Sequence, residues 1–162
     1  MRAEFINPFL QAASEVLEAE LGSPPLRGPV GLQRSSYTTD DVTAVVAVAG
    51  QVAGLVLVVM TEVTARAIVS QMMGQEFAEL DELAQSGIGE IGNVITGRAT
   101  VLLAEAGYPS NVAPPMLIVG RGTLVSTLDM QRLVIPLETA LGRVEVQVAL
   151  KAEAAGARAR VA

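Results

Sequence analysis

The apolar segment from Val42 to Met60, "VTAVVAVAGQVAGLVLVVM", constrains the fold of this chain more than any other stretch. It is long enough to cross a bilayer as a helix. However, β-branched valine dominates it, the glycines of "AGQVAG" interrupt it, and Asp40, Asp41 and Glu62 flank it without a basic anchor. Valine favours strands, and membrane spans are usually bordered by basic residues. The segment therefore predicts two strands joined by a glycine-containing turn.

Three helices are predicted around this hairpin. The first begins at Asn7 as N-cap with Pro8 at the first helical position, and it ends at Gly22. The second is capped by Thr61 and runs to about Met73, with a glycine in the C′ position. A long helical pattern follows from about residue 80 to residue 105.

The remaining strands come from four apolar runs, one before the hairpin at residues 30–37 and three after the long helix. The three later runs are "PMLIVG", "QRLVIPLE" and "RVEVQVALK", and "YPSNVAPP" before them reads as a loop. In the last run Val144, Val146 and Val148 alternate onto one face. The order of helix, three strands, two helices and three strands predicts an α+β fold, in which helices cover one side of an antiparallel-rich sheet.

Composition limits the classes of function. The 162 residues are 51% hydrophobic and 17% charged, which predicts one folded domain over residues 1–150. We expect the Ala/Arg-rich tail at 151–162 to be frayed or disordered. The chain has no cysteine and no histidine, which excludes disulfides, thiol nucleophiles, Ser-His-Asp triads and the usual zinc sites, so we expect no metal site. The net charge of −6 argues against nucleic acid or an anionic membrane as partner and fits a cytoplasmic protein; no signal peptide is evident.

The stretch "SGIGEIGNVITG" contains a G-x-G-x-x-G pattern at Gly87, Gly89 and Gly92. A dinucleotide-binding fingerprint needs a strand before its glycines, so that they form the turn into a helix facing the pyrophosphate. Here the preceding residues, "EFAELDELAQ", are acidic and helical in character. We therefore interpret the stretch as the inside of the long helix.

As a helix, this stretch has two distinct faces. The side chains predicted to face the core fall within roughly an 80° sector: Leu80, Ala84, Ile88, Ile91, Ile95 and Leu102. The opposite side, within roughly 60°, carries a hydroxyl, a carboxylate, an amide and a glycine: Ser86, Glu90, Asn93 and Gly97. An ordinary solvated helix face also holds such residues. The positions of the glycines suggest a further distinction. Gly97 would let another protein approach the backbone, whereas Gly87 and Gly92 would allow tight helix packing.

The pattern Ser86-x-x-x-Glu90-x-x-Asn93 resembles the Ser/Asp-x-x-x-Glu-x-x-Asn motif of the CheC/CheX/FliY family of bacterial chemotaxis phosphatases. The motif continues as "VITG" and leads through an apolar helix to the proline-bearing loop "SNVAPPMLIVG". The order of elements is similar over about residues 5–150. A single motif copy, a leading helix and no appended flagellar-switch domain make the chain most similar to the CheX branch, although this helix has more glycines than the family leads us to expect.

The resemblance implies hydrolysis of the aspartyl phosphate on a CheY-type response regulator. It implies that Asn93 orients the attacking water and that Glu90 pairs with the active-site lysine of the regulator. Ser86 would lie at the contact edge, and with Gly97 it forms the expected partner-binding pair. The resemblance further implies that Mg²⁺ belongs to the regulator, that this chain binds no cofactor, and that it forms a homodimer in which sheet edges join.

Two other functions remain open at this point. One is a non-catalytic docking or dimerisation module that binds a response regulator, and the other is an unrelated small-molecule-binding domain. The presence of both Glu90 and Asn93 favours the phosphatase, because an adaptor has no use for a water-orienting amide.

Overall fold

The structure, a computed structural model, describes residues 2–34 and 36–154. The described helices are α1 (Ala3–Leu21), α2 (Glu62–Met73) and α3 (Glu82–Glu105). The described strands are β1 (Leu26–Arg27), β2 (Gly31–Gln33), β3 (Ser36–Thr38), β4 (Val42–Gly50), β5 (Val52–Met60), β6 (Ser110–Val112), β7 (Met116–Val119), β8 (Leu124–Ser126), β9 (Arg132–Thr139) and β10 (Gly142–Ala152).

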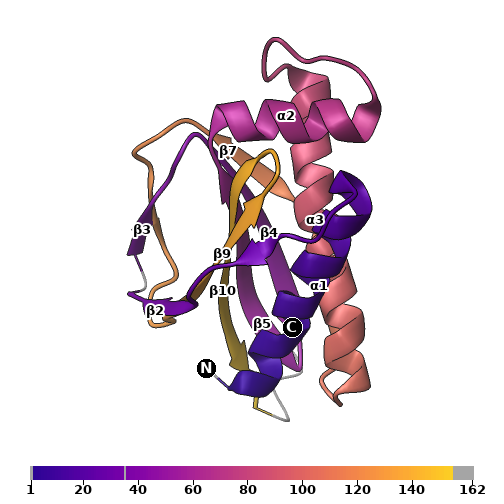
Figure 1. Ribbon diagram of the computed structural model, residues 1–162. Coiled ribbons are helices and arrows are strands. Elements are labelled where there is room, and N and C mark those ends of the chain that lie inside the picture. The colour runs from indigo at the N-terminus through magenta and orange to yellow at the C-terminus, as the bar shows by residue number, and fades with distance from the viewer. Residues whose placement is uncertain (1, 35, 155–162) are drawn as a thin grey trace.

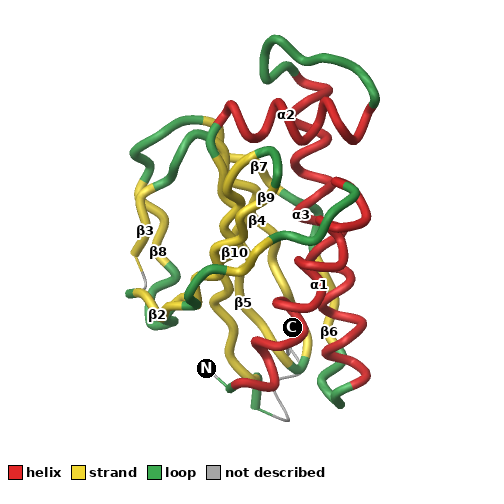
Figure 2. Tube along the Cα trace, viewed as in Figure 1, coloured by secondary structure: helices red, strands yellow, loops and turns green. Residues whose placement is uncertain are grey.

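The strands of the described part form one large antiparallel sheet and one small one. The large sheet has eight strands in the order β1-β9-β10-β5-β4-β6, with β2 also pairing with β9 and β7 with β4. The small sheet pairs β3 with β8. Helices α1 and α3 lie along one face of the large sheet, and β3 and β8 lie on its other side (Figures 1 and 2). The predicted α+β class, an antiparallel sheet with helices on one side, is confirmed.

The central hairpin is confirmed and explains why its sequence is apolar throughout. Strands β4 and β5 pair along their length, with Val42 opposite Met60. Side chains that alternate toward the helices, such as Val58, join the main core, whereas Val45 and Leu57 are buried on the other side of the sheet. Both faces of these strands are thus covered, so a polar/apolar alternation is lost. None of the described helices has the length and hydropathy that a membrane span requires.

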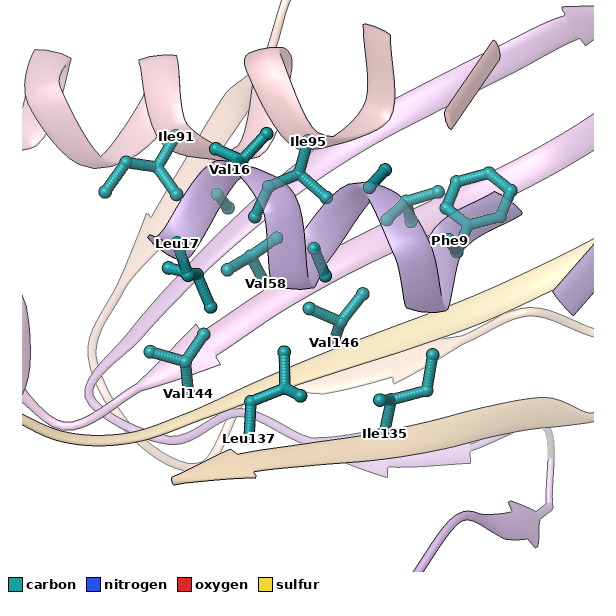
Figure 3. Close-up of a cluster of buried hydrophobic side chains, with 14 of the residues drawn as sticks. Phe9, Val16, Leu17, Val58, Ile91, Ile95, Ile135, Leu137, Val144 and Val146 are labelled. Atoms are coloured by element: carbon teal, nitrogen blue, oxygen red, sulfur yellow. The ribbon is translucent and has the colours of Figure 1, made fainter. Parts of the chain in front are cut away.

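The main core lies between the sheet and helices α1 and α3 (Figure 3). Figure 3 shows the contributing side chains: Phe9, Val16 and Leu17 of α1, Ile91 and Ile95 of α3, and Val58, Ile135, Leu137, Val144 and Val146 of the strands. Burial of apolar surface on this scale is the main stabilising term for such a fold. It also fixes which face of α3 points inward.

Helix α2 matches the prediction, whereas α1 begins earlier than predicted. The Thr61 side chain accepts a hydrogen bond from the backbone N–H of Thr64, and Gly74 ends α2 in the left-handed conformation. Helix α1 begins at Ala3, so Pro8 lies inside it and Asn7 is not its N-cap. The earlier start brings Phe5 into the core, 2% exposed, which offsets the helix bond lost at the proline.

Several strand boundaries also differ from the prediction. The run at 30–37 divides into β2 and β3, which belong to different sheets. The segment read as a loop contains β6, and β8 was not predicted. Strand β10 continues to Ala152, because Lys151 and Ala152 pair with β5, so the first two residues of the segment 151–162 are part of the sheet. The rest of the expected tail, from 155 onward, lies outside the described residues.

Candidate active site

The candidate site lies on α3, the longest helix of the described chain. Asp81 caps its N-terminus, with its carboxylate Oδ1 2.8 Å from the backbone nitrogen of Ala84. The apolar side predicted from the sequence faces the core: Ala84, Ile88, Ile91 and Ile95 are buried, while Leu80 and Leu102 pack against the core from its margin. The helix therefore has a single outward face.

This outward face carries the four residues predicted from the sequence. Ser86 and Glu90 are exposed, and Asn93 and Gly97 are partly exposed. Residues separated by three or four positions are neighbours on a helix surface, so the hydroxyl, the carboxylate and the amide follow one another along it. Nothing lies within 4 Å of the position that a Cβ would occupy at Gly97.

The polar groups of this face have no partner within the described part of the chain. The side chains of Ser86, Glu90 and Asn93 make no hydrogen bond or ion pair to any described residue. The next charged residue along α3 is different, because Arg98 Nε lies 2.8 Å from Glu15 Oε2 of α1. Each partner stabilises the charge of the other, which raises the pKa of Arg98 and lowers that of Glu15. The candidate residues are therefore free to meet groups of another molecule.

Gly87 and Gly92 lie where α3 packs closely against its neighbours, as interpreted from the sequence. A Cβ at Gly87 would lie 2.9 Å from Met73 Cε and from Val69 Cγ1, both in α2. A Cβ at Gly92 would lie 3.1 Å from Ala44 Cβ in the sheet. The G-x-G-x-x-G pattern thus lies within a helix and forms no phosphate-binding turn.

A groove of about 510 Å³ runs beside the candidate residues. Its α3 wall includes Ser86, Gly89 and Glu90, and its other wall consists of Pro115, Met116 and Leu117 at the start of β7. The sequence did not identify this second wall. The run "PMLIVG" predicted a strand, but nothing in it indicated that the strand would lie at a free edge next to α3.

Two further hollows, of about 290 and 510 Å³, lie on the helix-free side of the sheet and share Tyr37, Arg143 and Glu145 in their linings. The larger of the two borders Arg132, which is 3% exposed. Its Nη2 donates to the carbonyl oxygen of Ser36 at 2.7 Å, and its guanidinium lies 5.0 Å from the Tyr37 ring centroid. Burial lowers the pKa of Arg132. These contacts join the small sheet to the large one, a structural role.

The donor set offers little to a metal ion. Among the described residues there is no group of three or more Asp, Glu, His or Cys that could hold one. Glu90 and Asn93 together supply a single carboxylate and a single amide, whereas Mg²⁺ prefers six oxygen ligands in octahedral geometry. The face suits recognition and the orientation of a water molecule.

Comparison with known proteins gives a consistent result. The model of the family "Chemotaxis phosphatase CheX" matches residues 42–138. The CheY-P phosphatase CheX of Thermotoga maritima is 30% identical over 131 residues, covering 80% of this chain and 84% of that protein.

Solved structures agree in fold. The chemotaxis protein CheX from Desulfovibrio desulfuricans has a TM-score of 0.81 and 29% identity, over 93% of this chain and 99% of that one. The CheX of a CheX-CheY-BeF3-Mg complex from Borrelia burgdorferi has a TM-score of 0.73 and 24% identity, over 93% of this chain and 99% of that one.

Proposed function

The chain belongs to the CheX family of chemotaxis phosphatases, and from this premise we propose that it hydrolyses the aspartyl phosphate of a CheY-type response regulator in chemotaxis. The resemblance to the CheC/CheX/FliY family, and to its CheX branch, is confirmed. The observation that carries the residue assignment is the outward face of α3, where Glu90 and Asn93 are one turn apart and have no partner among the described residues.

The reaction places a small chemical demand on the phosphatase. A water oxygen attacks the phosphorus, the bond between phosphorus and the aspartate oxygen breaks, and the carboxylate leaves with the electron pair. Both protons of the water remain on the product, H₂PO₄⁻, so no general base has to take one up. The barrier lies mainly in holding the water in line with the leaving oxygen.

Asn93 suits the positioning of that water. Its amide can accept a hydrogen bond from the water through the carbonyl oxygen and donate one through the NH₂ group, and it is not consumed. Asn93 is partly exposed and so reachable from solvent. A residue that enters the active site of another protein must be reachable in this way.

Glu90 suits docking. Its carboxylate would pair with the active-site lysine of the regulator, as the family resemblance implies, and so bring Asn93 to the phosphoryl group. The i, i+3 spacing lets both side chains enter one pocket. Ser86 and Gly97 extend the contact one turn in each direction, with Gly97 offering open backbone.

The regulator supplies the metal in this proposal. The Borrelia burgdorferi complex contains Mg²⁺ together with CheY, and we infer the same division here, with Mg²⁺ on the regulator and no cofactor on this chain. We also propose that the protein acts in the cytoplasm as a homodimer in which sheet edges join, since β1, β6 and β7 leave strand edges unpaired in the described chain.

The direct test is loss of phosphate from a phosphorylated CheY-type receiver of the same organism with Mg²⁺. We expect wild-type protein to accelerate the loss, Asn93→Ala not to, and the matched control Asn111→Ala, an exposed asparagine of β6, to behave as wild type. Binding without acceleration by the wild type would replace this proposal with a docking module. Equal activity of Asn93→Ala and wild type would remove Asn93 from the mechanism.

A further inference from the structure

We propose that an apolar rim formed by Leu83, Val94 and Met116 surrounds Glu90, and that this rim receives the surface around the regulator's active-site lysine and thereby sets affinity. The inference rests on the proposed function and adds residues to it. Leu83 and Val94 belong to α3, and Met116 is the first residue of β7.

The two α3 members lie on the same face as Glu90. Leu83 precedes Glu90 by seven positions and Val94 follows it by four, spacings that bring side chains onto one side of a helix. Leu83 is 52% exposed and Val94 is 39% exposed. Two large aliphatic side chains are thus held in solvent on the face of the unpartnered carboxylate, Val94 about one turn and Leu83 about two turns away from it.

Met116 borders Glu90 from the other flank. It is 65% exposed and lines the groove that Glu90 and Ser86 also line. Among the described strands β7 pairs only with β4, so its outer edge is open to an approaching molecule. An exposed methionine adapts its shape to a partner at little cost, which suits a contact surface.

The charge pattern indicates which kind of partner surface binds here. Glu90 is the only charged residue of α3 between Glu82 and Arg98, and Arg98 is already paired with Glu15. A lone carboxylate in a neutral and partly apolar surface is complementary to a single cationic side chain such as the regulator's lysine. Closing the rim around that pair would exclude water and strengthen the pairing, as residues around an interface hot spot do.

Val101 provides a matched control because it lies on the same helix stripe outside the rim. It is 49% exposed and follows Val94 by seven positions, roughly 10 Å further along the helix axis. If the regulator instead lies over the C-terminal half of α3, Val101 is the residue that will respond.

The experiment measures the dissociation constant for a CheY-type receiver activated with Mg²⁺ and beryllofluoride, together with kcat on the phosphorylated receiver. We expect Val94→Ser and Met116→Gln each to weaken binding about fivefold and to leave kcat within about twofold. Val101→Ser should bind as wild type. Valine and serine have similar helix propensities, and Met116→Gln changes a strand residue, so the two variants do not share a folding liability.

Three outcomes would overturn the rim. The first is unchanged affinity in both rim variants while the wild type still dephosphorylates the receiver, which leaves the proposed function intact. The second is weakened binding in Val101→Ser alone. The third is loss of a homodimer in Val94→Ser with unchanged affinity, measured by light scattering, which would make this face a contact between copies. A wild type that neither binds nor dephosphorylates the receiver would overturn the proposed function and the rim together.

Discussion

Two polar clusters of this molecule differ in how their groups are satisfied. On the helix-free side of the sheet, Arg132 is almost fully buried and bonds both Ser36 and Gln147, and Gln147 Nε2 in turn lies 2.6 Å from Glu145 Oε1. On the outward face of α3, Glu90 and Asn93 have no partner within the described residues.

The difference separates structure from function. Most buried polar groups are bonded within the fold, because each unpaired one lowers the free energy of unfolding. Exposed groups can bond to water at no such cost, and they remain available to a second molecule. The Arg132 cluster should therefore affect stability, and the α3 cluster should affect activity and binding.

The largest expected effect is that of Asn93→Ala on turnover. Removing a group that positions the reacting water should lower kcat about 100-fold to 1,000-fold, the range found when a single transition-state hydrogen-bond donor is removed. Affinity for the activated receiver and the urea midpoint should stay at wild-type values, because the side chain is not needed for packing. Parallel loss of affinity and turnover would contradict a role in orienting water.

Arg132→Met should have the largest effect on stability. It leaves the carbonyl of Ser36 and the amide of Gln147 without their buried partner, so we expect the free energy of unfolding to fall by about 3 kcal/mol. Urea denaturation measures this, with the exposed Arg143→Met as control and an expected change below about 0.5 kcal/mol. Phosphatase activity per folded molecule should not change. A selective loss of activity in Arg132→Met would break the distinction between the two clusters.

Glu90→Gln should act on binding in a salt-dependent manner. The substitution removes the charge and keeps the shape, so we expect affinity for the receiver to fall about tenfold at low ionic strength and by less at high ionic strength. Glu105→Gln, an exposed glutamate in the last turn of α3, should bind as wild type. Wild-type affinity of Glu90→Gln at low salt would contradict the lysine pairing.

The sequence predicted those parts of the fold that local chemistry determines. The two faces of α3 follow from helical periodicity, and Thr61 and Gly74 mark the ends of α2 by capping chemistry. The α1 start was wrong because burial of Phe5, a tertiary contact, outweighed the local preference for proline at the first position.

Local sequence patterns could not predict the short strands or the contacts between segments that are far apart in the sequence. Strands β3 and β8 have three residues each and depend on each other, with Tyr37 opposite Val125. The groove wall at Met116 depends on where β7 pairs, which the sequence pattern does not specify. The candidate residues on α3 could be identified because they share one helix, whereas the surface around them could not.

The smallest effects are expected from two glycines of α3, one on its packed side and one on its open side. Gly97→Ala should raise the free energy of unfolding by about 0.5–1 kcal/mol, because alanine favours the helix and the new Cβ meets nothing within 4 Å. Gly87→Ala should lower it, because the Cβ would lie 2.9 Å from Val69 Cγ1 and Met73 Cε and would push α2 away from α3.

Thermal denaturation compares these two variants, and receiver binding adds a second measurement. If a regulator approaches the backbone at Gly97, Gly97→Ala should be more stable than wild type and yet bind the activated receiver more weakly, by about twofold to fivefold. Gly87→Ala should show the reverse, with lower stability and wild-type affinity for as long as it is folded. Greater stability of Gly97→Ala with unchanged affinity would keep Gly97 on the open side of the helix and remove it from the contact with the partner.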